Sequence, residues 1–333
     1  MPRRALLVGI NTYGGTGDND LHACAADARA LEHALSRHKD GRKNFDCITW
    51  ADRTSDNGHI TRPSLRAALL ELFRFDGDVL LHFSGHGFLS ETGGLLCTSD
   101  GIQDDWGIPM QEVVDLAVKS QAHQILLILD CCHSGNFGNP SALSAVAGKN
   151  PLSTIRENMT VIAASHATEA AVEAGGHGLF TSALLDGLEG GAADHMGFVT
   201  APALYMYARR RFTAWDQRPV FKTNASDVLC VRECEPLIDR LQLRQLNTIF
   251  PTADHKYPLD PEYEPEDEFG NVKEPIDTEK VAIAKLFKSY RDAGLVRSSN
   301  PALQFYWVAR QSGTVELTAR GREYWWLLVN DKI

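Results

Sequence analysis

One histidine and one cysteine have similar surroundings, because each stands shortly after an apolar run and within three residues of a glycine. His86 lies between two glycines just after the run at 79–83, and Cys132 follows the run at 125–129. A thiolate nucleophile needs a base within hydrogen-bond reach, and flanking glycines let a substrate backbone come close. These residues predict a dyad in which Cys132 attacks a carbonyl carbon and His86 accepts the thiol proton.

The backbone near the dyad is expected to bind the oxyanion that such an attack creates. The N–H groups of Gly87 and Cys132 are placed to do so, and each preorganised donor lowers the barrier by about 3 kcal/mol. Taken singly, a cysteine at a strand end is more often a small buried hydrophobe, and a glycine-flanked histidine is more often a turn residue. The occurrence of both segments in one chain favours the catalytic interpretation.

A metal site is the alternative that the neighbouring side chains suggest. Cys131 and His133 flank Cys132, but adjacent residues of an extended chain point in opposite directions. Neighbouring residues of this kind cannot easily chelate one ion. We therefore expect no metal and no other cofactor in the catalytic step.

Short apolar runs alternate with helical patterns over the first two thirds of the chain. This alternation predicts a mostly parallel α/β sheet covered by helices on both faces, with catalytic groups beyond the carboxyl ends of its strands. The runs lie at 5–10, 47–51, 79–83, 125–129, 161–164 and 220–222, and the helical patterns at 24–37, 63–73 and 110–118.

Two compositional breaks suggest how the chain is divided. Residues 136–158 are rich in Gly, Asn, Ser, Pro and Ala and predict an exposed loop. Residues 251–275 hold five prolines and eight acids, which predicts an extended linker. We expect a main domain at 1–235, divided into 1–135, the loop and 159–235, then a helix and linker at 236–276 and a second domain at 277–333.

The second domain is predicted to be a small α+β unit of winged-helix type. Its pattern gives a helix at 279–291, strands at 304–309 and 314–318, and a closing helix at 321–329. Nine Lys and Arg against six acids leave a mild excess of 9 − 6 = +3 in this unit, without the dense basic stripe that phosphate binding favours. A protein partner is therefore expected here rather than nucleic acid.

Composition places the chain among globular proteins of a reducing compartment. Its 333 residues carry a net charge of −10, which disfavours non-specific nucleic-acid binding. The seven cysteines are odd in number and irregularly spaced, which indicates reduced thiols. The first apolar run has six residues, too few for a signal-peptide core or a membrane span. We expect a cytoplasmic protein with no membrane partner.

At these residues the sequence resembles the caspase-like peptidases, and bacterial and metacaspase-type members more than animal caspases. The separation of 132 − 86 = 46 residues is near the roughly 50 known in caspases. The resemblance covers about residues 3–225 and implies a six-stranded caspase-like fold, protein substrates, Cys132 as nucleophile and His86 as base. It rests on Ala-Leu-Leu-Val-Gly-Ile at 5–10, Ser-Gly-His-Gly at 84–87, Asp-Cys-Cys-His-Ser-Gly at 130–135 and Gly-Leu-Phe-Thr-Ser-Ala-Leu-Leu at 178–185.

The resemblance also implies a primary specificity pocket. Cys24 and Asp27 match a metacaspase pattern that lines it, and Ser84 and Asp130 occupy two further pocket positions. Two buried carboxylates favour a cationic side chain, and arginine can pair with one of them through two hydrogen bonds. We therefore expect cleavage after Arg or Lys. Each acid also has an alternative without a role in substrate binding. Asp27 would then be an acid on a helix surface, and the carboxylate of Asp130 would hold loop backbone.

Metacaspases often bind calcium and are often activated by a cut near the nucleophile loop. Asp104 and Asp105 are the only comparable acidic cluster ahead of Cys132, and they fall short of the six to eight oxygen ligands that calcium takes. Lys149 and Arg156 are the basic residues of the loop and hence the candidate processing sites of a zymogen. Self-cleavage and cleavage by an activating protease both stay open.

Three functions are therefore compared. The first is a regulated cysteine endopeptidase of bacterial defence or stress, whose C-terminal unit binds a regulatory protein. The second is a catalytically silent scaffold or DNA-associated regulator that acts through that unit. The third is a peptidase of separase or gingipain type with another specificity. The presence of both Cys132 and His86 favours catalysis.

Overall fold

The six apolar runs form one sheet in the computed structural model of the chain. Its order is β12-β8-β7-β3-β1-β2, and all neighbours are parallel except β12, which is antiparallel to β8. The strands are β1 (Arg3–Gly9), β2 (Asp46–Ala51), β3 (Asp78–Ser84), β7 (Ile125–Asp130), β8 (Met159–Ala163) and β12 (Val220–Asn224). The predicted six-stranded, mostly parallel α/β fold is thus confirmed.

The structure describes most of the chain, with gaps. The described residues are 1–14, 20–51, 59–90, 93–102, 105–131, 155–164, 173–174, 176–212, 219–264, 266, 271–272 and 275–333. They form two compact units, Met1–Glu235 and Pro236–Ile333. No helix within these described ranges is long and apolar enough to cross a membrane.

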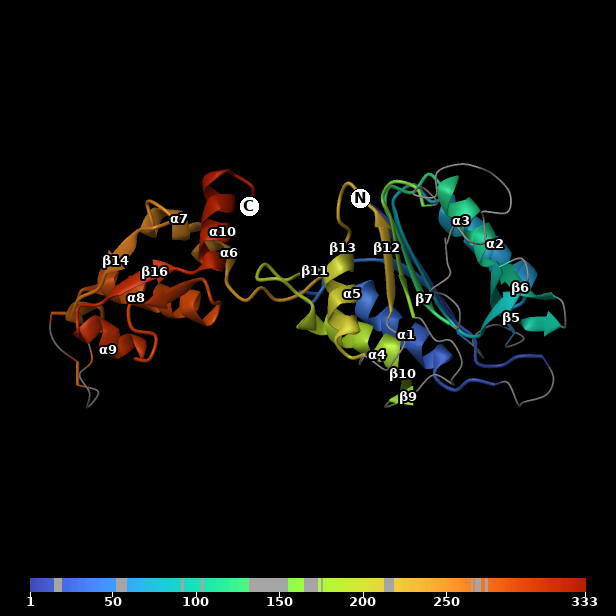
Figure 1. Cartoon of the computed structure of the whole chain (residues 1–333), viewed down its shortest axis with the longest axis horizontal. Coiled ribbons are helices and arrows are strands. Elements are labelled where there is room, and N and C mark those ends of the chain that lie inside the picture. The colour runs from blue at the N-terminus through green and yellow to red at the C-terminus, as the bar shows by residue number, and fades with distance from the viewer. Residues whose placement is uncertain are drawn as a thin grey trace. The chain divides into compact units, whose positions relative to one another are not determined.

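Helices cover both faces of the sheet, as Figure 1 shows. The helices α1 (Cys24–Ser36), α4 (Leu179–Asp186) and α5 (Ala201–Arg209) pack on one face, and α2 (Arg62–Phe73) and α3 (Met110–Val118) pack on the other. Side chains of each strand alternate between the two cores, so Leu80 packs with α1 while Leu81 packs with α2. Each buried Leu, Ile or Val contributes about 1.5–3 kcal/mol, which fixes the register of the strands.

A smaller antiparallel sheet lies over the α2 and α3 side. Its strands β4 (Gly87–Ser90), β5 (Gly93–Ile102) and β6 (Asp105–Pro109) follow directly after the segment that carries His86. Close packing of β6 on β5 requires glycine at one point, because a Cβ on Gly107 would lie 2.0 Å from the carbonyl oxygen of Leu96. The strands of this sheet are rich in glycine, so the sequence pattern does not predict them.

His82 is fully buried in the middle of β3. Neither ring nitrogen has a hydrogen-bond partner among the described residues, and burial lowers the pKa of His82 to about 3. The unfolded chain therefore binds a proton near pH 6.5 that the folded chain takes up only near pH 3. We predict that the free energy of unfolding falls as the pH is lowered through this window.

The substitution His82→Leu tests that prediction. It removes two unsatisfied ring nitrogens, so the free energy of unfolding at pH 7.5 should rise by about 1–3 kcal/mol and depend less on pH. Urea unfolding followed by circular dichroism between pH 4 and pH 8 measures both effects. The exposed His123, replaced by Gln, serves as control, and a wild-type pH dependence in His82→Leu would contradict the prediction.

The second unit is built on an antiparallel sheet ordered β14-β16-β15. Three of its predicted elements are confirmed, the helix at 279–291 as α8, the strand at 314–318 as β16 and the closing helix at 321–329 as α10. The elements are α6 (Arg240–Arg244), α7 (Leu246–Ile249), β14 (Lys256–Pro258), η4 (Pro261–Tyr263), α8 (Thr278–Asp292), β15 (Val296–Ser298), α9 (Phe305–Arg310), β16 (Thr314–Leu317) and α10 (Ala319–Val329).

Two expectations for this unit were wrong. The run at 304–309 forms helix α9 rather than a strand, because Phe305, Val308 and Ala309 are its buried residues and share one face at helical spacing. The segment at 251–275 is not only a linker, because β14 pairs with β16 and Lys280 of α8 forms ion pairs with acids near η4. Its prolines and acids resemble those of a linker, but its aromatic side chains are packed against α8.

Candidate active site

The pairing of β3 with β7 brings the predicted catalytic segments together. Ser84 lies opposite Asp130 at the carboxyl ends of the two strands, and the N–H of Gly85 donates to the carbonyl oxygen of Asp130 at 3.2 Å. His86 follows immediately, and the buried Cys131 directly follows β7. Cys132 lies outside the described residues, so its contact with His86 stays a prediction.

The backbone of His86 is held on both sides. Its N–H donates to the hydroxyl of Tyr13 at 2.7 Å, and its carbonyl oxygen accepts from the N–H of Cys97 at 3.0 Å. The rings of Tyr13 and His86 also lie against each other, with centroids 4.6 Å apart. Burial raises the pKa of Tyr13 well above its ordinary value, so its hydroxyl stays neutral. The main chain around His86, the predicted base, is therefore preorganised.

Asp27 is buried at the start of α1, on the sheet face opposite α2. Its carboxylate accepts hydrogen bonds from the Ser84 hydroxyl at 3.3 Å and the Gly178 N–H at 3.4 Å. The Nδ1 atom of His177 lies 2.8 Å from the other carboxylate oxygen. The structure thus places Asp27 beside Ser84, and the alternative of a surface acid is wrong because the exposed fraction of Asp27 is 1%. The role of both residues in a specificity pocket stays a prediction.

Asp130 is the second buried carboxylate of this region. It accepts a hydrogen bond from the Thr181 hydroxyl of α4 at 2.6 Å. A Cβ atom on Gly178 would lie 3.2 Å from a carboxylate oxygen of Asp130 and 3.4 Å from one of Asp27. The two carboxylates thus converge on the same glycine, beside the strand end that leads to His86.

The charges of Asp27 and Asp130 favour the binding of a cationic group. Burial, followed by the charge of Asp130, raises the pKa of Asp27 to about 6. A second negative charge in a poorly hydrated site is costly unless a cation compensates it. A guanidinium or ammonium group placed between the carboxylates would supply that compensation.

The other predicted site residues lie nearby or outside the described residues. Cys24 is buried one turn before Asp27, so both lie on one side of α1. Gly87 begins β4 directly after His86, which is consistent with a role in binding an oxyanion. The other predicted donor is the N–H of Cys132, which the structure does not describe.

Four further residues of this region are not among the site residues predicted from the sequence. Tyr13 holds the His86 segment, and His177, Gly178 and Thr181 contact the two carboxylates. The segment at 178–185 was noted only for its resemblance. No local pattern marks His177, whose partner Asp27 is 150 residues away in the sequence.

Of the two residues considered for calcium, only Asp105 is described. Asp105 is ion-paired with Arg62, and Asp104 lies outside the described residues. Across the described part of the chain, no group of three or more His, Cys, Asp and Glu is arranged to hold a metal ion.

Of the two candidate processing sites, Arg156 is described and Lys149 is not. The guanidinium of Arg156 donates to the carbonyl oxygens of Ser120 at 3.0 Å and Ala122 at 2.7 Å. Its side chain is thus bound to the connection between α3 and β7. Cleavage after Arg156 would require these hydrogen bonds to break.

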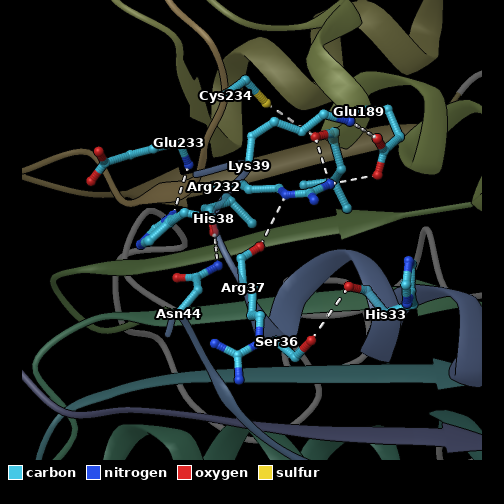
Figure 2. Close-up of polar contacts among 12 residues, drawn as sticks. His33, Ser36, Arg37, His38, Lys39, Asn44, Glu189, Arg232, Glu233 and Cys234 are labelled. Carbon is cyan, nitrogen blue, oxygen red and sulfur yellow. Dashed lines mark hydrogen bonds and ion pairs between the residues drawn. The ribbon is translucent and has the colours of Figure 1, made fainter. Parts of the chain in front are cut away.

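A second polar cluster, shown in Figure 2, has a structural rather than a catalytic arrangement. Arg232 of β13 (Cys230–Glu233) donates to the carbonyl oxygens of Leu188 and Arg37 and to Glu189. Lys39 lies 2.6 Å from Glu189, and these two cations lower the pKa of Glu189 to about 2. Each charge has a partner, so the cluster fastens β13 to the end of α1.

Most of the first unit matches a known protein family. The model of the caspase-domain family matches residues 2–230. Among solved structures, a crystal structure of a protein from Geobacter sulfurreducens is similar, with 19% sequence identity and a TM-score of 0.48. That match covers 71% of this chain and 98% of the other. No curated protein matches the chain.

Proposed function

This chain belongs to the caspase family of cysteine peptidases, and from this premise we propose that it cleaves proteins after arginine and lysine through Cys132 and His86. A metacaspase-type specificity is part of the proposal. It is supported by the segment at 130–135, in which Asp130 and Cys132 stand two residues apart.

The proposed reaction is acyl transfer through the thiol. His86 accepts the proton of the Cys132 thiol, and the thiolate forms a C–S bond with the carbonyl carbon. The N–H groups of Gly87 and Cys132 stabilise the oxyanion. His86 then donates its proton to the leaving amine as the C–N bond breaks. Water, deprotonated by His86, hydrolyses the thioester and regenerates the thiol.

The observation that carries the specificity is the convergence of Asp27 and Asp130 around Gly178. A substrate arginine placed there would neutralise two buried carboxylates and form charge-assisted hydrogen bonds with them. A substrate aspartate would add a third negative charge to a poorly hydrated site. The same edge of the sheet carries His86, so a side chain held by the acids would bring its carbonyl group to the base.

Hydrolysis of fluorogenic peptides ending in Arg, Lys or Asp tests this proposal, with and without calcium. We expect peptides ending in Arg to be cleaved faster than those ending in Lys, and peptides ending in Asp not to be cleaved. Efficient cleavage after Asp would contradict the assignment of the pocket. Silence with all three, also after limited proteolysis of the loop at 136–158, would favour the scaffold alternative.

The pKa of Asp27 predicts a pH dependence for arginine substrates. Below about pH 6 its carboxyl is protonated in the free enzyme, so one of two attractive charges is lost. We expect kcat/KM to fall as the pH is lowered through 6, mainly through a rise in KM, because bound arginine keeps Asp27 ionised.

The matched variant for this prediction is Asp27→Asn, which cannot titrate at this position. Every other ionisable residue is kept in this variant, so the difference between the two pH profiles reports on the loss of the Asp27 carboxyl. Steady-state kinetics from pH 5 to pH 8 measure it. Parallel profiles would show that Asp27 does not bind the substrate cation.

The second unit extends the proposal to regulation. Trp307 and Trp326 are exposed on it, and large exposed aromatic side chains are typical of surfaces that bind proteins. We propose that this unit recruits a protein partner, in a bacterial defence or stress response. Removal of residues 236–333 should then leave peptide hydrolysis intact and abolish cleavage of the natural substrate.

A further inference from the structure

A cavity of about 260 Å³ opens beside His86. Its walls come from the segment after β1, the start of β4 and the small sheet, and they include Tyr13, Gly87, Phe88, Cys97 and Trp106. An apolar cavity of roughly 150 Å³ is enough to bind benzene, so this one has room for an aliphatic or aromatic side chain.

The polar groups of the cavity wall are largely bound to neighbouring protein groups. The Tyr13 hydroxyl accepts the N–H of His86, and the Thr98 hydroxyl donates to Asp100 at 2.7 Å. The walls therefore present mainly ring faces and aliphatic carbon, with the rings of Phe88 and Trp106 5.8 Å apart. Phe88 is 43% exposed, so the mouth of the cavity has an apolar rim.

The cavity and the acidic pair lie on opposite sides of His86. The small sheet that forms the cavity packs with α2 and α3, whereas Asp27 belongs to α1 on the other face of the main sheet (Figure 1). A substrate whose basic side chain lies at Asp27 and Asp130 must pass His86 at the scissile bond. The residue after that bond, whose amine His86 protonates, then reaches the cavity.

We infer that this cavity is the subsite for an apolar side chain of the substrate residue that follows the scissile bond. The inference rests on the proposed peptidase function, which fixes where the leaving amine must be. It adds a second requirement to the substrate, a basic residue followed by a large apolar one.

Internally quenched peptides test the inference. They share one sequence with Arg before the bond and carry Gly, Ala, Leu, Phe or Asp after it. We expect kcat/KM for Leu or Phe to exceed that for Gly by about tenfold or more, the scale of selectivity that an apolar pocket provides. In Phe88→Ala and in Trp106→Ala this ratio should fall to within about threefold.

Leu89→Ala is the matched control. Leu89 is the next residue of β4, is similarly exposed at 46%, and points to the opposite face without lining the cavity. It should keep the wild-type ratio. Cleavage of all peptides at equal rates, or an unchanged ratio in Phe88→Ala, would overturn the subsite while leaving the arginine specificity standing. Failure to cleave any peptide, including the Gly member, would overturn the peptidase function and the subsite with it.

Discussion

Cys132→Ala is expected to lower kcat/KM for arginine peptides by a factor on the order of 10⁴ or more. The thiolate forms the covalent intermediate, and the methyl side chain of alanine has no nucleophile to replace it. His86→Ala should cost a similar factor, because the two side chains act as a unit. The double variant should therefore lose little beyond either single one. Fluorogenic hydrolysis under saturating and limiting substrate measures all three.

Cys131→Ala provides the control for this prediction. Cys131 is the neighbouring thiol, directly follows β7, and is buried in the core on the α2 and α3 side. Its loss should lower stability modestly and leave the thiol reaction intact. Activity that survives in Cys132→Ala and vanishes in Cys131→Ala would show that the nucleophile had been assigned to the wrong cysteine.

The main sheet could be predicted from the sequence because its strands are buried on both faces. Such strands are continuous apolar runs, and the helices between them show one apolar stripe. The small sheet could not be predicted in this way. Its glycines, such as Gly107, allow a neighbouring strand to pack closely, and only the tertiary structure shows this. Helix α9 was mistaken for a strand because aromatic residues favour strands locally, while the packing of Phe305 and Val308 decides otherwise.

Part of the candidate site could likewise be predicted from the sequence, and part could not. His86, Ser84 and Asp130 could be placed together because they end adjacent parallel strands, a relation that follows from the sheet alone. The contacts of Asp27 with His177 and of Asp130 with Thr181 join segments 150 and 51 residues apart. These contacts depend on how α1 and α4 pack side by side, and no short sequence motif predicts this packing.

Asp130→Asn is expected to lower kcat/KM for arginine peptides by a factor on the order of 10², since removal of one partner of a buried charge pair typically costs 2–5 kcal/mol. Lysine peptides should lose less, because a compact ammonium depends less on paired hydrogen bonds. Asp76→Asn changes the net charge equally at a side chain that is 79% exposed, and it should have no effect.

The same substitution should make the folded protein more stable. The charge of Asp130 is one cause of the raised pKa of Asp27, so its removal lets the pKa of Asp27 fall towards its ordinary value. Asp27 then ionises in the folded state at less cost, and the free energy of unfolding at pH 7.5 should rise by about 1 kcal/mol. Urea unfolding of Asp130→Asn beside Asp76→Asn measures this. A protein that is both less active and less stable would indicate that Asp130 mainly holds Thr181 and α4, whereas one that is less active and more stable has lost a site built to bind a cation.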